Sequence, residues 1–512
     1  MTLPIALTFM IAAAFSFAAD ALTLPRSGWR RAPRAYALHV ISVVFISSLL
    51  LALTRRPHFS AFVALALVAL LSAVSNAKYA SLREPFVFTD LSLFSQLFAH
   101  PRLYLPFLSM RTAIAIAAGV ALVACGFLLD LVAPANVAFA AAVVTVLSLA
   151  LGYVLAARLP LTLEPLDDQR RHGFFAVFVA YLLNGLRRAT FVQFEHALAA
   201  SPFARASEPA SRPDVIVIQS ESFFDARELG GSINPSILAN FEVAQRDSAA
   251  YGALDVPAWG ANTMRSEFAL LSGLSSAALG YARFYPYAFM RRAGPSLARW
   301  FLSAGYATLA IHPYYADFFG RKRVFPRLGF DRFVDIHAFA KAPRIGPYVA
   351  DSAVAERIIM ELESSRTRPS FIFAMTMENH GPLHLERIEA GEAERYHTLG
   401  EDLAWRDLTA YLRHLANADA MLGRLLEYAR TRRRDTVLCF YGDHVPALPH
   451  IFDRLGNVPD RSHYFIWRNF GDRSAAKHDL PVERLGTAVL QAMETASRSD
   501  APIGLSERTE KI

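Results

Sequence analysis

The sequence predicts an α-helical membrane domain followed by an α/β domain, and three features of the chain lead to this fold class. The first is composition, because 54% of the 512 residues are hydrophobic, which is too apolar for an ordinary soluble enzyme. The second is distribution, because charged residues are sparse up to about residue 158. The third is a change near residue 214, where short β-rich runs begin to alternate with helix-like segments, as in an α/β sheet.

Several apolar runs in the first part of the chain have about the length that crosses a bilayer. These five runs are 2–19, 36–53, 60–76, 112–132 and 137–157. The first run has no basic n-region and no clear cleavage site, so we interpret it as a retained helix rather than a signal peptide. We therefore predict a transmembrane domain of about five helices in residues 1–160.

The orientation of these helices is left open by the basic residues around them. Arginines and lysines follow the first run and lie between the third and the fourth, which would place both loops, and the α/β domain after five crossings, in the cytoplasm. They are Arg26, Arg30, Arg31, Arg34, Lys78, Arg83, Arg102 and Arg111. The run "FFAVFVAYLLNGL" at 174–186 would put the domain outside if it crossed as well, but its short length suits an interfacial helix better.

The remaining domain boundaries follow from composition. A stretch at 201–213 is rich in Pro, Ser, Ala and Arg and lacks periodicity, as a linker does. We assign 161–213 to an interfacial helix and linker, 214–497 to the α/β domain and 498–512 to a polar tail.

Charge and cysteine content exclude two classes of protein. Arginines that flank the apolar runs explain much of the net charge of +7, and the chain lacks the interleaved basic and aromatic pattern of a nucleic-acid binder. No nucleic acid is therefore predicted as a partner. The two cysteines, Cys125 and Cys439, exclude a disulfide framework.

Reactive side chains close the apolar runs of the α/β domain, where strands are expected to end. They are Glu221, His312, His380, Asp443 and His444. Ligand sites in such sheets lie beyond the carboxyl ends of the strands, so we expect these side chains to share one site. Taken singly, Glu221 also fits a helix cap or solvated loop residue, and His380 fits a buried structural histidine.

The stretch "WGANTMRSEF" at 259–268 places Thr263 at the expected start of a helix, and two interpretations fit it. Thr263 could be the N-cap that stabilises the helix. It could also be a nucleophile, because a helix N-terminus presents unpaired N–H groups that bind a phosphate. Together with Glu221, Asp443 and His444 it supplies two carboxylates, one imidazole and one hydroxyl oxygen, a reasonable set for one divalent cation. A metal-bound alcohol loses its proton more easily, which favours the nucleophile.

From about residue 214 to 470 the chain resembles the lipoteichoic acid synthase and periplasmic phosphoglycerol transferase group, membrane members of the alkaline phosphatase and sulfatase superfamily. The resemblance rests on five motifs in the right order, namely the "ES" of "IQSESFF", "GANTMRSEF", "HPYYADFFGR", "TMENHGP" and "YGDH". The stretch "KYASLREPFVFTDL" at 78–91 is similar to a loop that such transferases carry after their third span. The resemblance implies an α/β alkaline phosphatase/sulfatase-like catalytic domain over 214–497. It also places this domain outside a multi-pass bacterial inner (plasma) membrane, against the arginine count.

The resemblance further implies a function and a set of roles. Glu221, Thr263, Asp443 and His444 would hold one divalent metal, manganese or magnesium first and zinc as an alternative. Thr263 would carry phosphoglycerol from phosphatidylglycerol to a cell-envelope glycan. His380 and Arg321 would hold the glycerol phosphate, and His312 would stand near the leaving or entering oxygen.

One departure from the family pattern bears on the acceptor. Phe319 and Gly320 stand where relatives with polyglycerolphosphate products tend to have Trp and Asn, which favours a glycan acceptor over a lipoteichoic polymer.

Three alternatives to phosphoglycerol transfer remain. A phosphoethanolamine transferase shares the threonine and metal, although its soluble domain is usually rich in disulfides and only Cys439 lies in this one. A sulfatase-like hydrolase would need a Cys or Ser in a C/S-x-P-x-R context, which the nucleophile region lacks. A non-enzymatic glycan-binding module would be expected to lack a metal ligand, and all four are present.

Overall fold

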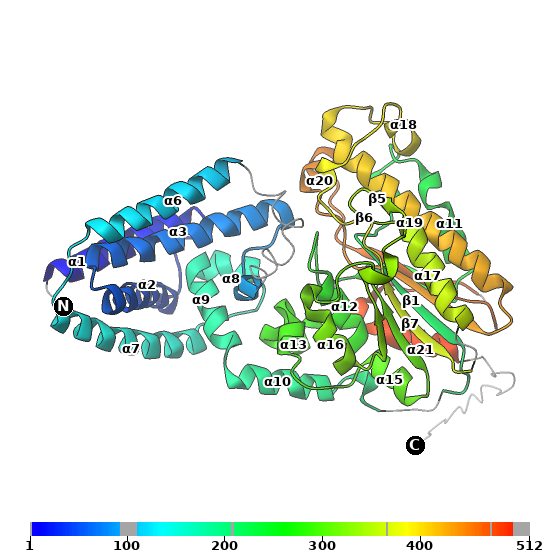
Figure 1. Cartoon of the computed structure of the whole chain (residues 1–512), viewed down its shortest axis with the longest axis horizontal. Helices are drawn as coiled ribbons and strands as arrows, with labels where there is room; N and C mark the ends of the chain where they lie inside the picture. Colours follow the sequence, from blue (N-terminus) through cyan, green and yellow to red (C-terminus); the bar gives the residue numbers. More distant parts are fainter. Residues whose placement is uncertain (1–2, 93–109, 206–208, 365–366, 472–473, 495–512) are drawn as a thin grey trace, which may run out of the picture.

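A computed structural model describes residues 3–92, 110–205, 209–364, 367–471 and 474–494. The predicted polar tail, 498–512, lies outside the described residues. A helical domain comes first in the chain and an α/β domain follows it, which confirms the predicted order of the two folds (Figure 1).

Four helices of the first domain are long and apolar enough to cross a membrane within the part of the chain that the structure describes. They are α1 (Leu3–Ala21), α2 (Pro33–Thr54), α3 (Pro57–Leu82) and α7 (Ala135–Arg158). The fourth predicted run, 112–132, forms α6 (Met110–Leu129), in which the described apolar segment Ala117–Leu129 is shorter than these four. A count of five crossing helices therefore stays a prediction.

The run at 174–186, predicted as an interfacial helix, forms a helix that is buried against other helices of the first domain. After α8 (Pro165–His172), helix α9 (Phe174–Gly185) packs against α2, α3 and α7, and most of its side chains are buried. Its apolar residues surround the helix rather than forming one stripe, so the helix is stabilised by burial on several faces. A bend of 68° separates α9 from α10 (Arg188–Ala199), and the two together are apolar enough to count as one broken span.

Aromatic packing joins the helical domain to the α/β domain. Phe88, in the turn η1 (Phe88–Ser92), meets Phe284 of the α/β domain edge-on, with ring centroids 6.4 Å apart. Tyr181 of α9 stacks on the same Phe284 ring at 5.1 Å. The two domains therefore share one continuous hydrophobic core.

A nine-stranded sheet forms the centre of the α/β domain, in the order β10-β2-β9-β8-β1-β7-β3-β4, with β11 also paired to β2. The strands are β1 (Asp214–Ser220), β2 (Ala250–Asp255), β3 (Ala307–Ile311), β4 (Arg332–Val334), β7 (Ser370–Met375), β8 (Thr436–Gly442), β9 (Ser462–Arg468), β10 (Ala476–Lys477) and β11 (Leu480–Pro481). From β8 to β4 all neighbours are parallel, whereas β9 runs antiparallel to both β8 and β2. A separate small hairpin joins β5 (Arg344–Ile345) and β6 (Tyr348–Val349).

Helices cover both faces of this sheet, which explains why its central strands are apolar throughout. Along β1, Val215 and Val217 belong to one core, and Ile216 and Ile218 belong to the other, as alternation along a strand requires. The first face is covered by α12 (Thr263–Ser272), α15 (Leu297–Ser303), α16 (Arg321–Leu328) and α21 (Val482–Met493). The second is covered by α11 (Ala239–Arg246), α17 (Asp351–Ser364) and α19 (Arg406–Thr431). Shorter helices are α13 (Ser276–Leu279), α14 (Pro286–Phe289), α18 (Ala393–Tyr396) and α20 (Pro449–Leu455).

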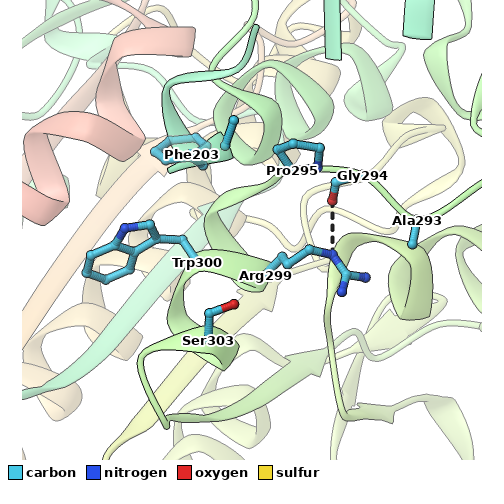
Figure 2. Close-up of a pocket in the computed structure, with 8 residues that line it drawn as sticks. Phe203, Ala293, Gly294, Pro295, Arg299, Trp300 and Ser303 are labelled. Carbon is cyan, nitrogen blue, oxygen red and sulfur yellow. Dashed lines mark hydrogen bonds between the residues drawn. The ribbon is translucent and has the colours of Figure 1, made fainter. Parts of the chain in front are cut away.

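A hollow of about 330 Å³ lies beside α15 (Figure 2). Its lining residues are Phe203, Ala204, Ala293, Gly294, Pro295, Arg299, Trp300 and Ser303. The Nε of Arg299 donates a 3.0 Å hydrogen bond to the carbonyl of Gly294, so the backbone holds the guanidinium of Arg299 in place. None of the lining residues is among those that the sequence singles out.

Candidate active site

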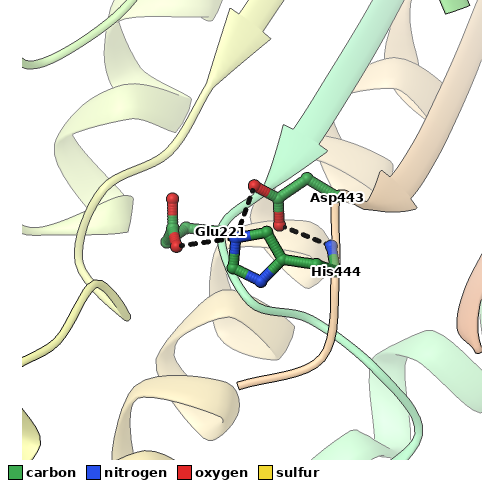
Figure 3. Close-up of side chains that lie close together, drawn as sticks. All are labelled: Glu221, Asp443 and His444. Atoms are coloured by element: carbon green, nitrogen blue, oxygen red, sulfur yellow. Dashed lines mark hydrogen bonds and ion pairs between the residues drawn. The ribbon is translucent and has the colours of Figure 1, made fainter. Parts of the chain in front are cut away.

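The register of the central strands brings three predicted metal ligands together. Ser220, the last residue of β1, pairs with Gly442, the last residue of β8, so Glu221 and Asp443 leave the sheet side by side. His444 follows directly. Ligand atoms of Glu221, Asp443 and His444 all lie within 4.8 Å of one another, and all three residues are buried (Figure 3).

The hydrogen bonds around this cluster leave acceptor atoms facing its centre. Oδ1 of Asp443 accepts from the backbone N–H groups of Ser222 at 2.8 Å and of His444 at 2.9 Å. Oδ2 of Asp443 is buried and has no hydrogen-bond partner. Nδ1 of His444 lies 2.9 Å from the carbonyl of Val445, to which it donates, so in the neutral imidazole Nε2 is the acceptor that faces the cluster.

A divalent cation fits this arrangement. Nε2 of His444 lies 3.5 Å from Oδ2 of Asp443 and 3.8 Å from Oε1 of Glu221. Burial and the neighbouring Asp443 carboxylate together raise the pKa of Glu221 to about 8. A bound cation would offset the repulsion between the carboxylates of Glu221 and Asp443 and would give Oδ2 of Asp443 a partner.

Thr263 is the first residue of α12, and it does not cap that helix. The N-cap position belongs to Asn262, whose backbone is left-handed with φ of 71° and whose side chain makes no capping hydrogen bond. The interpretation of Thr263 as the N-cap is therefore wrong. Its Oγ1 instead lies 3.5 Å from Nε2 of His444, beside the cluster of candidate metal ligands Glu221, Asp443 and His444.

Arg321 begins α16, and the carboxylate of Glu267 fixes its side chain. Its Nε and Nη2 donate to the carboxylate of Glu267 at 3.0 and 2.8 Å, and both side chains are almost fully buried. The rings of Phe318 and Phe319 lie 5.9 and 5.3 Å from the guanidinium. Glu267 follows Thr263 by four residues on α12, and residues at this spacing lie on the same face of a helix. This spacing in the sequence could have indicated that Glu267 points toward the same site as Thr263.

His312, one of the two predicted substrate histidines, lies beside Arg321. His312 follows β3, and its Nε2 lies 3.2 Å from Nη1 of Arg321. Burial, and then the charge of Arg321, hold the pKa of His312 well below its usual range, so this imidazole is neutral.

His380 is held by its own loop. Its Nδ1 lies 2.7 Å from the carbonyl of Gly381 and 3.3 Å from the hydroxyl of Tyr348. Burial lowers the pKa of His380, while the charge of Asp443 raises it and that of Arg321 lowers it. The charges of Asp443 and Arg321 therefore both act on the His380 ring.

Comparison with known proteins assigns the family. The Sulfatase family model matches residues 213–495, more than half of the chain, so the chain belongs to the sulfatase family. The predicted alkaline phosphatase/sulfatase-like fold is thereby confirmed.

Individual relatives extend this likeness over the whole chain. The chain is 29% identical over 535 residues to the capsular polysaccharide biosynthesis protein RkpI of Rhizobium meliloti (strain 1021), which covers 96% of this chain and 95% of that protein. Among solved structures, the integral membrane protein lipooligosaccharide phosphoethanolamine transferase A (EptA) of Neisseria meningitidis matches 96% of this chain and 95% of its own, with a TM-score of 0.57 and 12% identity. The phosphoglycerol transferase GacH of Streptococcus pyogenes, in complex with sn-glycerol-1-phosphate, matches 60% of this chain and 82% of its own, with a TM-score of 0.46 and 21% identity. The likeness to EptA shows that the two chains share one arrangement, in which a helical domain precedes a sulfatase-like domain.

Proposed function

We propose that the protein is a metal-dependent transferase that moves phosphoglycerol from phosphatidylglycerol to a cell-envelope glycan through Thr263. The observation that carries the proposal is the position of the Thr263 hydroxyl, 3.5 Å from Nε2 of His444 at the edge of the metal cluster. A helix N-terminus behind this hydroxyl adds partial positive charge where a phosphate would bind.

Glu221, Asp443, His444 and Thr263 would hold one divalent cation, manganese or magnesium, or zinc as the alternative. When bound, such a cation lowers the pKa of an alcohol beside it and offsets charge on phosphate oxygens. Carboxylate and hydroxyl oxygens with a single imidazole suit manganese and magnesium, and zinc also accepts this set.

The proposed reaction has two displacement steps at one phosphorus atom. In the first, Oγ1 of Thr263 bonds to phosphorus and gives up its proton, the bond from phosphorus to the diacylglycerol oxygen breaks, and this oxygen takes up a proton. In the second, an acceptor hydroxyl bonds to phosphorus and gives up its proton, the bond from phosphorus to Oγ1 of Thr263 breaks, and Oγ1 takes up a proton. Arg321, whose Nε and Nη2 already donate to Glu267, would contribute its positive charge to offset negative charge on the transferring oxygens. His312 is neutral, because burial and the charge of Arg321 hold its pKa well below the usual range, and it would stand near the leaving or entering oxygen.

The proposal places the catalytic domain on the extracytoplasmic side of a bacterial inner membrane. The family resemblance supports this side, and the named role of RkpI in capsular polysaccharide biosynthesis supports a surface glycan as acceptor. EptA, whose fold matches over the whole chain, makes phosphatidylethanolamine the alternative donor.

The test uses the purified full chain in detergent micelles with manganese and headgroup-labelled lipids. We expect diacylglycerol release from phosphatidylglycerol and a phosphoglycerol adduct on the peptide that contains Thr263, detected by mass spectrometry. Thr263→Ala is the matched control and should give neither product. Consumption of phosphatidylethanolamine in its place would favour the phosphoethanolamine alternative, and release of free headgroup with no transfer to any added glycan would favour a hydrolase.

A further inference from the structure

A loop of the membrane domain lies against the nucleophile helix. This docking loop, residues 83–92, leaves the end of α3, which is directed toward the catalytic domain (Figure 1). The contact is close, because a Cβ added at Gly260 would lie 3.3 Å from Cδ2 of Leu82 at the end of α3. The docking loop therefore begins beside the segment that carries Thr263.

One carboxylate in the docking loop binds residues on both sides of Thr263. Oε2 of Glu84 accepts a 3.3 Å hydrogen bond from Nδ2 of Asn262, the residue directly before Thr263. Oε1 of Glu84 lies 3.0 Å from Nη1 of Arg265, two residues after Thr263. Glu84 thus spans the first turn of α12 from outside the catalytic domain.

Lys78 of α3 and Arg265 of α12 hold Glu84 in its charged form and in one place. Burial alone would raise the pKa of Glu84, but the charges of Arg265 and Lys78 outweigh it and lower the pKa. Nζ of Lys78 lies 3.4 Å from Glu84 and 2.7 Å from Asp90, and Oδ2 of Asp90 accepts a 2.8 Å hydrogen bond from the N–H of Val87. Glu84, Val87 and Asp90 all belong to the docking loop, so these contacts fold the loop around the ammonium group of Lys78.

The start of α12 needs such support. Asn262 has a left-handed backbone, which costs free energy for a residue with a side chain, although Asn tolerates it better than most. Its side chain does not cap α12, so the hydrogen bond to Glu84 is what fixes that side chain. A small shift of this turn would move the Thr263 hydroxyl away from the metal cluster.

We propose that Glu84 is a positioning residue that holds Thr263 against the metal ligands, so that the membrane domain completes the active site. The inference rests on the proposed role of Thr263 as nucleophile. It deepens the proposed function, because the reacting hydroxyl is then placed where the membrane domain meets the catalytic domain, as a lipid donor requires.

The neighbouring Arg83 offers a matched control. Its Nη2 lies 2.6 Å from Oδ1 of Asp453 on α20, and its guanidinium lies over the Trp259 ring at 5.3 Å. Arg83 therefore joins the same loop to the catalytic domain without a contact to Asn262 or Arg265 among the interactions that the structure describes. Glu84→Ala and Arg83→Gln separate positioning of Thr263 from simple attachment of the two domains.

The experiment measures lipid turnover and amide hydrogen exchange on full chains in detergent micelles. For Glu84→Ala we expect kcat to fall about tenfold or more at unchanged KM, because small displacements of a reacting group have large effects on rate. Exchange should become faster in residues 260–268. Glu84→Gln keeps an acceptor for Asn262 and should recover part of kcat, and Arg83→Gln should keep the wild-type kcat and exchange.

Two results would overturn the inference. One is Glu84→Ala with wild-type kcat and wild-type exchange in residues 260–268, and the other is Arg83→Gln with the same defects as Glu84→Ala. If the wild-type chain turns over no lipid, the proposed function fails. The exchange comparison still decides whether Glu84 holds the turn of Thr263.

Discussion

Glu267 and Arg321 form a buried ion pair that links α12, which begins with Thr263, to α16, which begins with Arg321. Nη2 of Arg321 lies 2.8 Å from Oε2 of Glu267, and the side chains are 1% and 0% exposed. The hydroxyl of Tyr287 donates to the same carboxylate. A shift of either helix would therefore be transmitted to the other.

Glu267→Gln should lower both stability and turnover. It leaves the buried guanidinium without a counter-charge, so we expect a loss of about 3 kcal/mol in the free energy of unfolding and at least about a tenfold loss of kcat. Thermal unfolding and lipid turnover on one preparation measure both. Glu356→Gln, in the exposed pair with Arg424, is the control and should change stability by less than about 1 kcal/mol. Equal effects in the two variants would contradict a special role for Glu267.

Thr263→Ala should remove turnover and leave the melting temperature nearly unchanged. The reason is that Thr263 makes no capping bond, so its loss costs α12 little. Thr263→Ser should keep some activity. Ser275, whose side chain caps α13 by accepting from Ala278, is the contrasting control, because Ser275→Ala should lose about 1 kcal/mol of stability and retain activity. Substantial turnover by Thr263→Ala would end the nucleophile hypothesis.

Asp443→Asn and His444→Ala should each weaken manganese binding by about a hundredfold, because the remaining ligands offset too little of a divalent charge in a buried site. Calorimetric titration of the full chain with manganese measures this. Asp453→Asn, at an exposed carboxylate, serves as the control. Wild-type affinity in both cluster variants would show that the metal binds elsewhere.

His414 should make stability fall as the pH rises from about 6.5 to 9. Its ring nitrogens lie 3.0 Å from Glu378 and 2.9 Å from Glu386, and although burial lowers the pKa of His414, these carboxylates raise it to about 9. Because the folded-state pKa lies above the unfolded value, the stabilisation is complete below about pH 6.5 and is lost through pH 9, amounting to no more than about 3 kcal/mol.

Melting temperatures measured across this pH range test the role of His414. His414→Gln should flatten the dependence, whereas His450→Gln, at an exposed histidine, should not. An unchanged slope in His414→Gln would show that other groups control it.

The C-terminal end of the chain should report an extracytoplasmic location. A fused alkaline phosphatase, which requires the periplasm, should be active, and a fused cytoplasmic fluorescent reporter should be dark. Fusions after Thr54, between α2 and α3, provide the internal reference for orientation. A C-terminal reporter that works only in the cytoplasm would overturn the topology and the lipid donor with it.

The features that the sequence could predict are those encoded locally. Apolar runs ended within a residue or two of Glu221, His312 and Asp443, and parallel strands that end together then bring Glu221 and Asp443 side by side. The order of the five motifs along the chain indicated the sulfatase superfamily. Both kinds of signal are readable along the chain without knowledge of packing.

The features that the sequence could not predict depend on contacts between distant segments. Glu84 and Asn262 are 178 residues apart, and neither residue carries a local sign of the other. The burial of α9 could not be predicted for the same reason, because only the neighbouring helices α2, α3 and α7 bury it. The choice of Asn262 over Thr263 as N-cap depends on a left-handed backbone that residue type does not dictate.

The strand order of the sheet separates two parts of the site that can vary independently. The proposed metal ligands follow β1 and β8, which are neighbours, whereas His312 and Arg321 follow β3, on the far side of β7. Substitutions in the segment after β3 can therefore alter which headgroup fits and leave the strands that carry the ligands undisturbed. A lineage could change its donor lipid in this way without rebuilding its chemistry, and we expect the sequence between His312 and Arg321 to diverge where headgroup preference diverges.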